Sequence, residues 1–295
     1  MKVRYLIEFL FFKIFKFILF FLPRKYCLLL GGLLGRFYFY LDKRRRQIAL
    51  SNLASAFPNQ KNSFGLKKIA LNSAIHFGRV FFDLTKNFFL TSAERDSLIE
   101  VKGKKNLHQA IKQGKGIIFF TAHYGNWEIA PWFISRYGKL NVIARPLDNP
   151  YLEKEVIKLR SILGSNIIYK KNASKKVLRA LKNKEMVAIL IDQNVMRNQA
   201  VFVDFFGKKA ATTPSLATFH LRTGVPIVPL FCYPQEKNKY KLIIYPPLGF
   251  LLTNNFRQDV LQITQKCTKI IENEIKKNPQ YWLWFHQRWR TRSKE

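Results

Sequence analysis

Short apolar segments rich in β-branched and aromatic residues alternate with helix-compatible segments from residue 101 onward. The expected strands are 117–121, 140–144, 166–169, 186–191, 227–233 and 240–245. The expected helices are 104–113, 126–136, 151–163, 174–182, 215–222 and 256–277. Such alternation implies a mainly parallel sheet that helices cover on both faces, so we predict an α/β fold. A long helical region at 63–90 precedes it and is expected to be core-facing scaffold.

The N-terminal segment 5–22 is apolar and rich in phenylalanine, and a Pro-Arg-Lys sequence closes it. As a helix it would reach about 27 Å, slightly less than the roughly 30 Å of a membrane's hydrocarbon core. Lys13 and Lys16 interrupt the segment, and a central lysine costs on the order of 2.5 to 3.5 kcal/mol on insertion. We therefore expect residues 1–25 to form a membrane anchor, which either spans or lies in the interface. Residues 26–295 are expected to form one catalytic domain.

Positive charge dominates the chain, because 51 lysines and arginines outnumber 18 acidic residues and give a formal net charge of +33. This balance points to an anionic partner: nucleic acid, an acidic carrier protein or an anionic membrane surface. The run Lys43-Arg44-Arg45-Arg46 is expected to contact anionic lipid head groups. The three cysteines and five histidines lack the spacing of a disulfide framework or a metal site, so no metal is expected.

The segment 116–130 carries the first candidate for chemistry. An apolar strand ends near His123, which places an imidazole at the carboxyl end of a strand, where open α/β folds bind ligands. Glu128 follows five residues later, and we expect its carboxylate to fold back onto one ring nitrogen while the other faces substrate. Such a carboxylate fixes the tautomer and stabilises the imidazolium that forms during general-base catalysis. The alternative is that both residues cap a helix N-terminus.

Polar residues also follow two other expected strands. Arg145 follows one of them, and Asp192 and Gln193 follow another. The carboxyl ends of parallel strands meet at one edge of a sheet, so these side chains are expected to share a crevice with His123. An arginine there can hold a phosphate or stabilise an oxyanion. The chain lacks a Gly-x-Ser-x-Gly nucleophile motif and a Gly-rich phosphate loop, which favours direct attack by a substrate hydroxyl that His123 deprotonates.

The segment 281–290, Tyr-Trp-Leu-Trp-Phe-His-Gln-Arg-Trp-Arg, is both aromatic and basic. Such a segment can stack single-stranded bases, lie in a membrane interface or cap the core, and we favour the interface together with the core. A basic RNA- or membrane-binding protein without catalysis would need basic and aromatic residues interleaved on an exposed face. Most phenylalanines here lie in apolar runs instead, so a nucleic-acid partner is not expected.

Six ordered sequence blocks resemble those of one enzyme family. They are His-Tyr-Gly-Asn-Trp-Glu (123–128), Ala-Arg-Pro-Leu-Asp-Asn-Pro-Tyr-Leu (144–152), Asp-Gln (192–193), Phe-Phe-Gly-Lys-Lys-Ala-Ala-Thr-Thr (205–213), Val-Pro-Ile-Val-Pro-Leu (225–230) and Trp-Leu-Trp-Phe-His-Gln-Arg-Trp (282–289). On these blocks the chain resembles the lipid A biosynthesis late acyltransferases, the lauroyl and myristoyl transferases of Gram-negative bacteria. Residues 48–58 match the N-terminal pattern of that family, so the resemblance covers nearly the whole chain.

The resemblance implies a glycerolipid-acyltransferase-like fold and an enzyme on the cytoplasmic face of the bacterial inner membrane. It implies transfer of a fatty acyl group from acyl carrier protein, without another cofactor, to a hydroxyl on a primary acyl chain of a Kdo–lipid A precursor. His123 would be the general base and Glu128 its partner. The residues expected to bind substrate are Asn126, Arg145, Asp192 and Gln193, with Arg145 on an acceptor phosphate or the thioester oxyanion. Glycerophospholipid and phosphatidylinositol-mannoside acyltransferases share the His-x4-acid core and remain the alternative.

Overall fold

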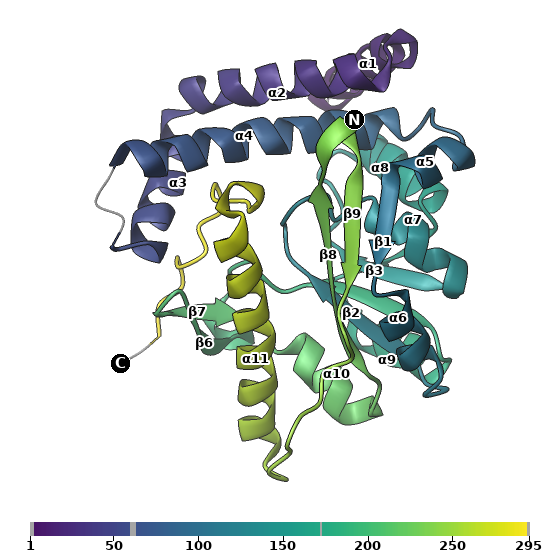
Figure 1. Cartoon of the computed structure of the whole chain (residues 1–295), viewed down its shortest axis with the longest axis vertical. Coiled ribbons are helices and arrows are strands. Elements are labelled where there is room, and N and C mark those ends of the chain that lie inside the picture. Colours follow the sequence, from purple (N-terminus) through teal and green to yellow (C-terminus); the bar gives the residue numbers. More distant parts are fainter. Residues whose placement is uncertain (1–2, 60–62, 172, 294–295) are drawn as a thin grey trace.

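The computed structural model describes residues 3–59, 63–171 and 173–293, and it confirms the α/β architecture (Figure 1). A seven-stranded sheet has the strand order β1-β9-β8-β2-β5-β3-β4. The strands are β1 (Ile99–Lys102), β2 (Ile117–Thr121), β3 (Leu140–Ala144), β4 (Ser165–Tyr169), β5 (Met186–Leu190), β8 (Ile227–Pro234) and β9 (Tyr240–Ile244). All neighbouring strands pair in parallel except β8 and β9, so the prediction of a mainly parallel sheet is correct.

Strand β2 lies in the middle of this sheet and is buried along its whole length. Its Ile118 pairs with Val187 of β5 on one side and with Ile227 of β8 on the other, and both pairings are parallel. The carboxyl ends of these strands therefore lie at one edge of the sheet. The chain leaves β2 toward His123 at this edge, which is where open α/β sheets bind ligands.

Helices cover both faces of the sheet, and the side chains of β2 show the reason. Ile118 and Phe120 belong to the core shared with α9 (Ala173–Lys182), α10 (Ser215–Thr223) and α11 (Phe256–Lys277). Ile117 and Phe119 belong to the core shared with α6 (Lys104–Ile111) and α7 (Ala130–Ile134). Successive strand residues face opposite sides, so a strand that is apolar at every position must be covered twice.

Four N-terminal helices lie at one edge of the molecule, and the third of them turns away from the other three at one end (Figure 1). They are α1 (Val3–Phe21), α2 (Arg24–Leu41), α3 (Lys43–Ala56) and α4 (Ser63–Lys86). Helices α2 and α4 lie side by side at close range because glycines meet in the contact. A Cβ added to Gly31 would lie only 2.6 Å from the carbonyl oxygen of Gly78. Gly31 and Gly35 of α2 therefore allow the close packing of these two helices.

Helix α1, which corresponds to the expected anchor, is tied to the rest of the protein at several points. Asn149 donates to Tyr5 O at 2.8 Å, Lys16 pairs with Glu155 of α8 (Pro150–Ile162) at 2.7 Å, and Lys86 donates to Leu19 O at 2.9 Å. Within the described ranges, no helix has both the length and the apolar character needed to cross a membrane.

Three local features differ from the sequence prediction. An antiparallel hairpin of β6 (Val201–Phe205) and β7 (Lys208–Thr212) turns at Phe206 and Gly207, which both have positive φ as a type I′ turn requires. Strand β1 also goes unpredicted, because its four residues lie directly between α5 (Ser92–Leu98) and α6. The helix expected at 126–136 is shorter, because residues 127–129 form a turn and α7 begins only at Ala130.

Candidate active site

His123, which follows β2, contacts Asp192, which follows β5. The His123 ring Nδ1 lies 2.9 Å from Asp192 Oδ1, and the backbone N–H of His123 donates to Asp192 Oδ2 at 2.9 Å. One carboxylate therefore fixes both the main chain and the ring of the histidine. The structure thus brings together polar residues from the ends of two neighbouring parallel strands, as the sequence pattern predicts.

The carboxylate of Asp192 is buried, with 4% of the residue exposed, and it accepts a third hydrogen bond from Trp282 Nε1 at 2.8 Å. Burial raises the pKa of this carboxyl, but the charge of His123 and the hydrogen bonds from His123 and Trp282 outweigh it. Together they lower the pKa of Asp192 to about 2. Asp192 is therefore ionised at neutral pH and can accept the hydrogen bond from Nδ1 that orients the His123 ring.

The other ring nitrogen of His123 is the one available for chemistry. Gln193 Nε2 lies 3.2 Å from His123 Nε2. An ionised carboxylate only accepts hydrogen bonds, so Nδ1 carries the proton and Nε2 keeps a lone pair, which accepts from the Gln193 amide. Trp127 packs its ring edge-on against the imidazole at 5.0 Å between centroids. The assigned tautomer is the one that a general base requires.

The C-terminal aromatic segment holds the loop that carries His123 through backbone hydrogen bonds. Leu283 N donates to His123 O at 3.1 Å, and Gly125 N donates to Tyr281 O at 2.9 Å. Gly125 has a φ of +61°, and a Cβ there would overlap the carbonyl oxygen of Cys232. Trp282 and Trp284 are fully buried, so the prediction of a core role is confirmed for both, and an interfacial role is wrong for both.

Glu128 does not contact the imidazole as the sequence analysis expects. Its carboxylate instead pairs with Arg160 of α8, with Oε1 2.9 Å from Nη2 and Oε2 3.4 Å from Nε. The chain turns after Trp127 rather than entering a helix, which directs Glu128 toward α8, and Asp192 already occupies Nδ1 of His123. The prediction of a direct hydrogen bond between His123 and Glu128 is therefore wrong, although both side chains line the same cavity.

A cavity of about 340 Å³ lies beside His123. Its walls come from β2, β3, β5, α7 and α8, and most of them are apolar, including Phe119, Ile134, Leu140, Val142, Leu159 and Leu163. The polar groups on its wall include His123, Glu128, Arg145, Arg160 and Gln193. An apolar chamber with a base and two arginines suits an apolar chain that ends in a reactive carbonyl.

The two other residues predicted to bind substrate, Arg145 and Asn126, lie in different surroundings. Arg145 lines the cavity but is largely exposed and pairs with Asp148 at 2.8 Å. Asn126 is 1% exposed, its side-chain amide donates to the buried Asp83 at 3.2 Å, and it does not line the cavity, so its role in substrate binding stays a prediction. Asn126 is held inward, because its N–H donates to Cys232 O at 2.9 Å.

The structure also adds residues that sequence reasoning misses. Arg160 is one of many basic residues on a helix surface, and only its contact with Glu128 in the structure identifies it as part of the site. Arg288 is completely buried and donates to Ala211 O at 2.6 Å and to Gln193 O at 3.4 Å, so it supports Gln193. Burial lowers the pKa of Arg288 to about 10. Across the described residues, no group of three histidine, cysteine, aspartate or glutamate side chains is arranged to hold a metal ion.

Comparison with known proteins gives concordant matches. The sequence profile of a family described as bacterial lipid A biosynthesis acyltransferase matches residues 1–291. A lipid A biosynthesis palmitoleoyltransferase of Escherichia coli (strain K12) is 26% identical over 274 residues, which cover 92% of this chain and 87% of that protein. A lipid A biosynthesis lauroyltransferase of the same strain is 25% identical over 267 residues, with 89% and 85% covered.

A second group of relatives acts on a different kind of lipid. A phosphatidylinositol mannoside acyltransferase of Mycobacterium tuberculosis (strain ATCC 25618 / H37Rv) is 25% identical over 194 residues. This match covers 64% of this chain and 59% of that protein. The names in both groups are those of acyl-transferring enzymes.

Proposed function

The chain belongs to the bacterial lipid A biosynthesis acyltransferase family, and from this premise we propose that it transfers a fatty acyl group from acyl carrier protein to a Kdo–lipid A precursor. The acceptor atom in this proposal is a hydroxyl on a primary acyl chain of the precursor. The observation that carries it is His123, whose Nε2 faces a mainly apolar cavity while Asp192 holds Nδ1. A hydroxyl nucleophile needs the base, and a fatty acyl chain needs the cavity.

In this proposal the transfer is direct, without an acyl-enzyme. The acceptor hydroxyl displaces the Gln193 amide from His123 Nε2 and gives its proton to that nitrogen as its oxygen attacks the thioester carbonyl carbon. Asp192 stabilises the imidazolium and keeps the ring in place. The carbon–sulfur bond then breaks, and the imidazolium returns the proton to the departing thiolate. The products are an ester on the acceptor and the free thiol of the carrier.

The cavity between β3 and α8 receives the donor acyl chain in this proposal. Each methylene buried there contributes about 0.8 kcal/mol. Glu128 acts through Arg160, whose guanidinium it holds at the polar wall of the cavity. Arg145 can exchange its exposed partner Asp148 for an acceptor phosphate or the thioester oxyanion.

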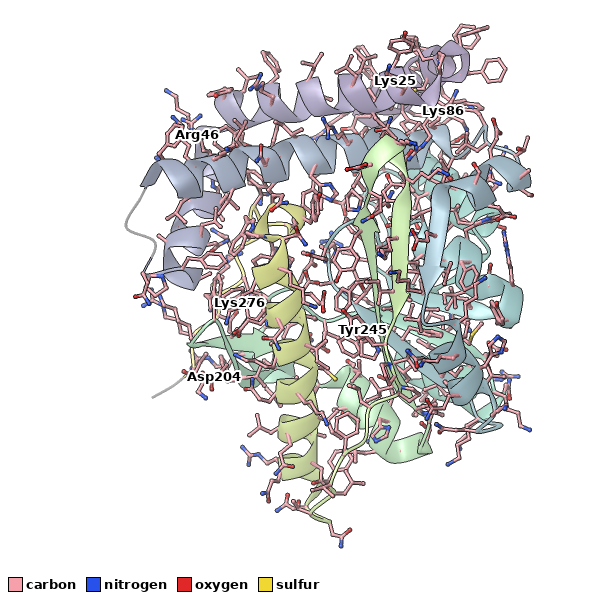
Figure 2. All side chains as sticks on the ribbon, in the orientation of Figure 1. Lys25, Arg46, Lys86, Asp204, Tyr245 and Lys276 are labelled. Atoms are coloured by element: carbon pink, nitrogen blue, oxygen red, sulfur yellow. The ribbon has the colours of Figure 1, made fainter. Side chains whose placement is uncertain are left out.

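We place the enzyme on the cytoplasmic face of the bacterial inner membrane. The support is the distribution of exposed apolar side chains: of the 28 large ones among the described residues, ten lie on α1 and nine on α2. Figure 2 shows side chains projecting from these two helices away from the sheet, with Lys25 near one end of α2 and Arg46 just beyond the other. Helices with one face so apolar and basic residues at their ends suit the interface of an anionic membrane.

The mycobacterial relatives favour one alternative, which is acyl transfer to a phosphatidylinositol mannoside. It uses the same base and the same cavity, so only the acceptor distinguishes it from the main proposal. The Kdo–lipid A acceptor is preferred because the two Escherichia coli relatives with lipid A names match 92% and 89% of the chain, whereas the mycobacterial relative matches 64%.

The test is product analysis with paired substrates in a nonionic detergent. The purified protein receives acyl groups on acyl carrier protein, with either a tetra-acylated Kdo–lipid A precursor or a phosphatidylinositol mannoside as acceptor. We expect the lipid A precursor to gain one acyl group, as an ester on a primary acyl chain. Transfer only to the mannoside would support the alternative, and transfer only from a coenzyme A thioester would refute the carrier protein as donor.

A further inference from the structure

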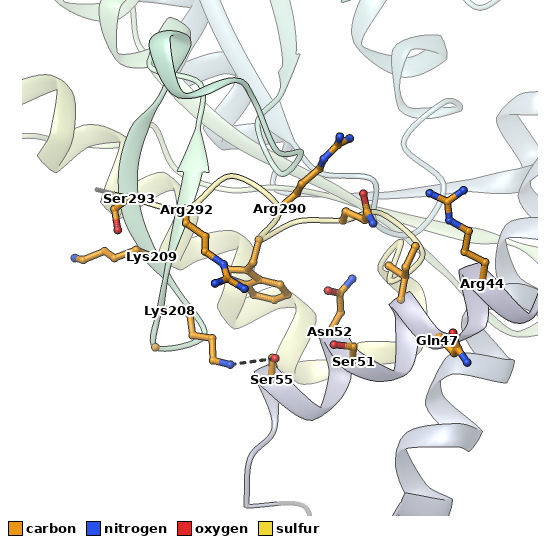
Figure 3. Close-up of a pocket in the computed structure, with 14 residues that line it drawn as sticks. Arg44, Gln47, Ser51, Asn52, Ser55, Lys208, Lys209, Arg290, Arg292 and Ser293 are labelled. Carbon is orange, nitrogen blue, oxygen red and sulfur yellow. Dashed lines mark hydrogen bonds between the residues drawn. The ribbon is translucent and has the colours of Figure 1, made fainter. Parts of the chain in front are cut away.

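A second, larger hollow lies between α3, the turn of β6 and β7 and the C-terminal segment (Figure 3). Its volume is about 1190 Å³. Its walls are the exposed side of α3, the β6–β7 turn and residues 287–293. Lys208 of the turn reaches across to α3 and donates to Ser55 at 3.1 Å, which closes one end. We call this feature the basic groove.

The lining of the basic groove is cationic and rich in hydrogen-bonding groups. Its cations are Arg44, Lys208, Lys209, Arg290 and Arg292, and its uncharged polar residues include Gln47, Ser51, Ser55 and Gln287. None of the 14 described residues that line it is acidic. Lys209 pairs with Asp204 at 3.0 Å outside the lining. The groove therefore offers several charges that a ligand with more than one anionic group would neutralise.

The arginines of the polybasic run at the start of α3 have different contacts. Arg45 donates to Phe285 O at 3.1 Å, and Arg46 donates to Phe39 O at 3.0 Å, so these two guanidinium groups stabilise the fold. Arg44 instead lines the basic groove. One end of the groove thus lies directly beyond α2, the helix that carries many of the exposed apolar side chains.

The groove extends away from that end along α3. From Arg44 to Ser55 the helix rises about 17 Å, and Figure 1 shows α3 leading from α2 toward the β6–β7 hairpin. A ligand that enters from the membrane side would therefore meet cations at both ends of the groove and hydroxyl and amide groups between them.

Two stretches of chain connect the basic groove to His123: the C-terminal segment at His286 and the residues that follow β5. Asn52 on the groove wall donates to His286 O at 2.7 Å, and His286 accepts from Asn194 N at 2.9 Å. Gln193, the residue before Asn194, contacts His123. Hydrogen bonds through His286, Asn194 and Gln193 therefore link the basic groove, which is cationic, to the mainly apolar cavity beside His123.

We propose that the basic groove binds the head group of the acceptor, which is a saccharide that carries at least two anionic groups. This proposal rests on the proposed function and adds the place where the acceptor is recognised. Arginine forks suit phosphate and carboxylate oxygens, the hydroxyl and amide side chains suit sugar hydroxyls, and Trp289 provides an aromatic ring on the same wall. The head group lies at the end of α2, so the acyl chains of the acceptor extend along the membrane.

An acidic carrier protein is the other anionic partner, and it fits the groove less well. A protein surface docks on a complementary surface with an apolar centre. Here the centre is concave and holds serine, glutamine and asparagine side chains, which a convex acidic surface would leave without partners. A branched, hydroxyl-rich head group fills such a space.

The experiment compares two double charge reversals in the full-length protein. Arg290→Glu with Arg292→Glu changes the groove. Lys105→Glu with Lys112→Glu makes the same change in net charge on α6 and at the residue that follows it, on the opposite side of Figure 1. Rates are measured in neutral detergent while either the tetra-acylated Kdo–lipid A precursor or the acyl carrier protein is varied. Circular dichroism and thermal unfolding verify the fold.

We expect the groove variant to raise the KM for the acceptor at least tenfold, with the KM for the carrier protein within twofold of wild type. The α6 variant should leave both within twofold. A rise in the KM for the carrier protein alone would assign the groove to the carrier and overturn the proposal, as would unchanged values for both substrates.

Binding without turnover separates this proposal from the proposed function. The His123→Ala protein, with and without the groove substitutions, is titrated with the tetra-acylated bis-phosphorylated disaccharide and, in parallel, with phosphatidylglycerol, both in neutral detergent. Disaccharide binding that weakens tenfold in the groove variant supports the groove even if the wild type transfers no acyl group. Equal weakening for both lipids would reduce the site to a general phosphate contact and overturn the saccharide assignment.

Discussion

Replacing Asp192 with asparagine removes one negative charge from the candidate active site with very little change in size. The site presents three donors to this carboxylate: the backbone N–H and Nδ1–H of His123 and the indole N–H of Trp282. Asparagine offers one oxygen and one amide group. Its oxygen can stay where the backbone and indole N–H groups converge, and its amide N–H then points at Nδ1 of His123.

The consequence is a change of tautomer. Nδ1 must accept the amide hydrogen bond, so the ring proton moves to Nε2, and the nitrogen that faces substrate can no longer take a proton. The charge that would stabilise the imidazolium is lost as well. General-base catalysis contributes typically 10²- to 10⁴-fold, so we expect kcat to fall about 10³-fold, which corresponds to about 4 kcal/mol.

The assay is the initial rate of acyl transfer at saturating donor and acceptor, with thermal unfolding to verify the fold. Trp282→Phe is the matched control, because it removes one hydrogen bond to Asp192 and keeps the contact with His123, and we expect only about a tenfold loss. Glu128→Gln tests the competing pair. If Asp192→Asn keeps activity within tenfold of wild type while Glu128→Gln loses 10³-fold, the structural reasoning is refuted.

Three further predictions concern stability and the membrane. Burial lowers the pKa of His76 to about 4 in the folded protein. As the pH falls below 6.5, this histidine therefore takes up its proton in the unfolded state before it does so in the folded state. The free energy of unfolding should decrease by about 3 kcal/mol between pH 6.5 and 4 because of this group. His76→Gln should remove this part of the slope in denaturant titrations. Gly31→Val should lower the free energy of unfolding by about 3 kcal/mol, since its Cβ meets the backbone of α4. Phe11→Ser with Phe17→Ser should weaken sedimentation with anionic vesicles at least a hundredfold, because burying each ring is worth about 2 kcal/mol.

Each of these has a matched comparison. Gly249→Ala adds a Cβ where nothing lies within 4 Å and should leave stability unchanged, and an equal loss in both glycine variants would contradict the packing argument. Phe256→Ser removes a half-exposed ring from α11 and should leave vesicle binding intact. For His76, the wild type and His76→Gln could instead lose the same free energy of unfolding between pH 6.5 and 4. That result would contradict the prediction, because it would show that the histidine titrates alike in the folded and unfolded states.

The sheet was predictable because its strands carry a strong local signal. The predicted strands at 117–121 and 140–144 coincide with β2 and β3, and the helix at 256–277 coincides with α11. Each of these strands is a short apolar run, and the order of strands and helices along the chain suffices to imply parallel pairing. The hairpin of β6 and β7 was harder, because its turn depends on positive φ at Phe206, a residue that rarely adopts it.

The catalytic contacts were only half predictable. The ends of β2 and β5 placed His123 and Asp192 at one edge of the sheet, yet proximity in sequence favoured Glu128 as the partner. The deciding fact is the direction of the chain after His123, which the C-terminal segment sets through Tyr281 and Leu283. Such long-range contacts leave no spacing in the sequence. The pairing of Arg160 with Glu128 is hidden for the same reason.

The measurement that tests the central claim most directly is transfer of radiolabelled acyl groups from acyl carrier protein to a tetra-acylated lipid A precursor by the wild type and by His123→Ala. We expect transfer by the wild type and at least a hundredfold less by the variant, with identical unfolding curves, because His123 Nε2 is the atom that takes the proton of the acceptor hydroxyl in the proposed reaction. Transfer by both proteins at similar rates would contradict the assignment of His123 as the base, and no transfer by the wild type to any glycolipid acceptor would contradict the proposed reaction itself.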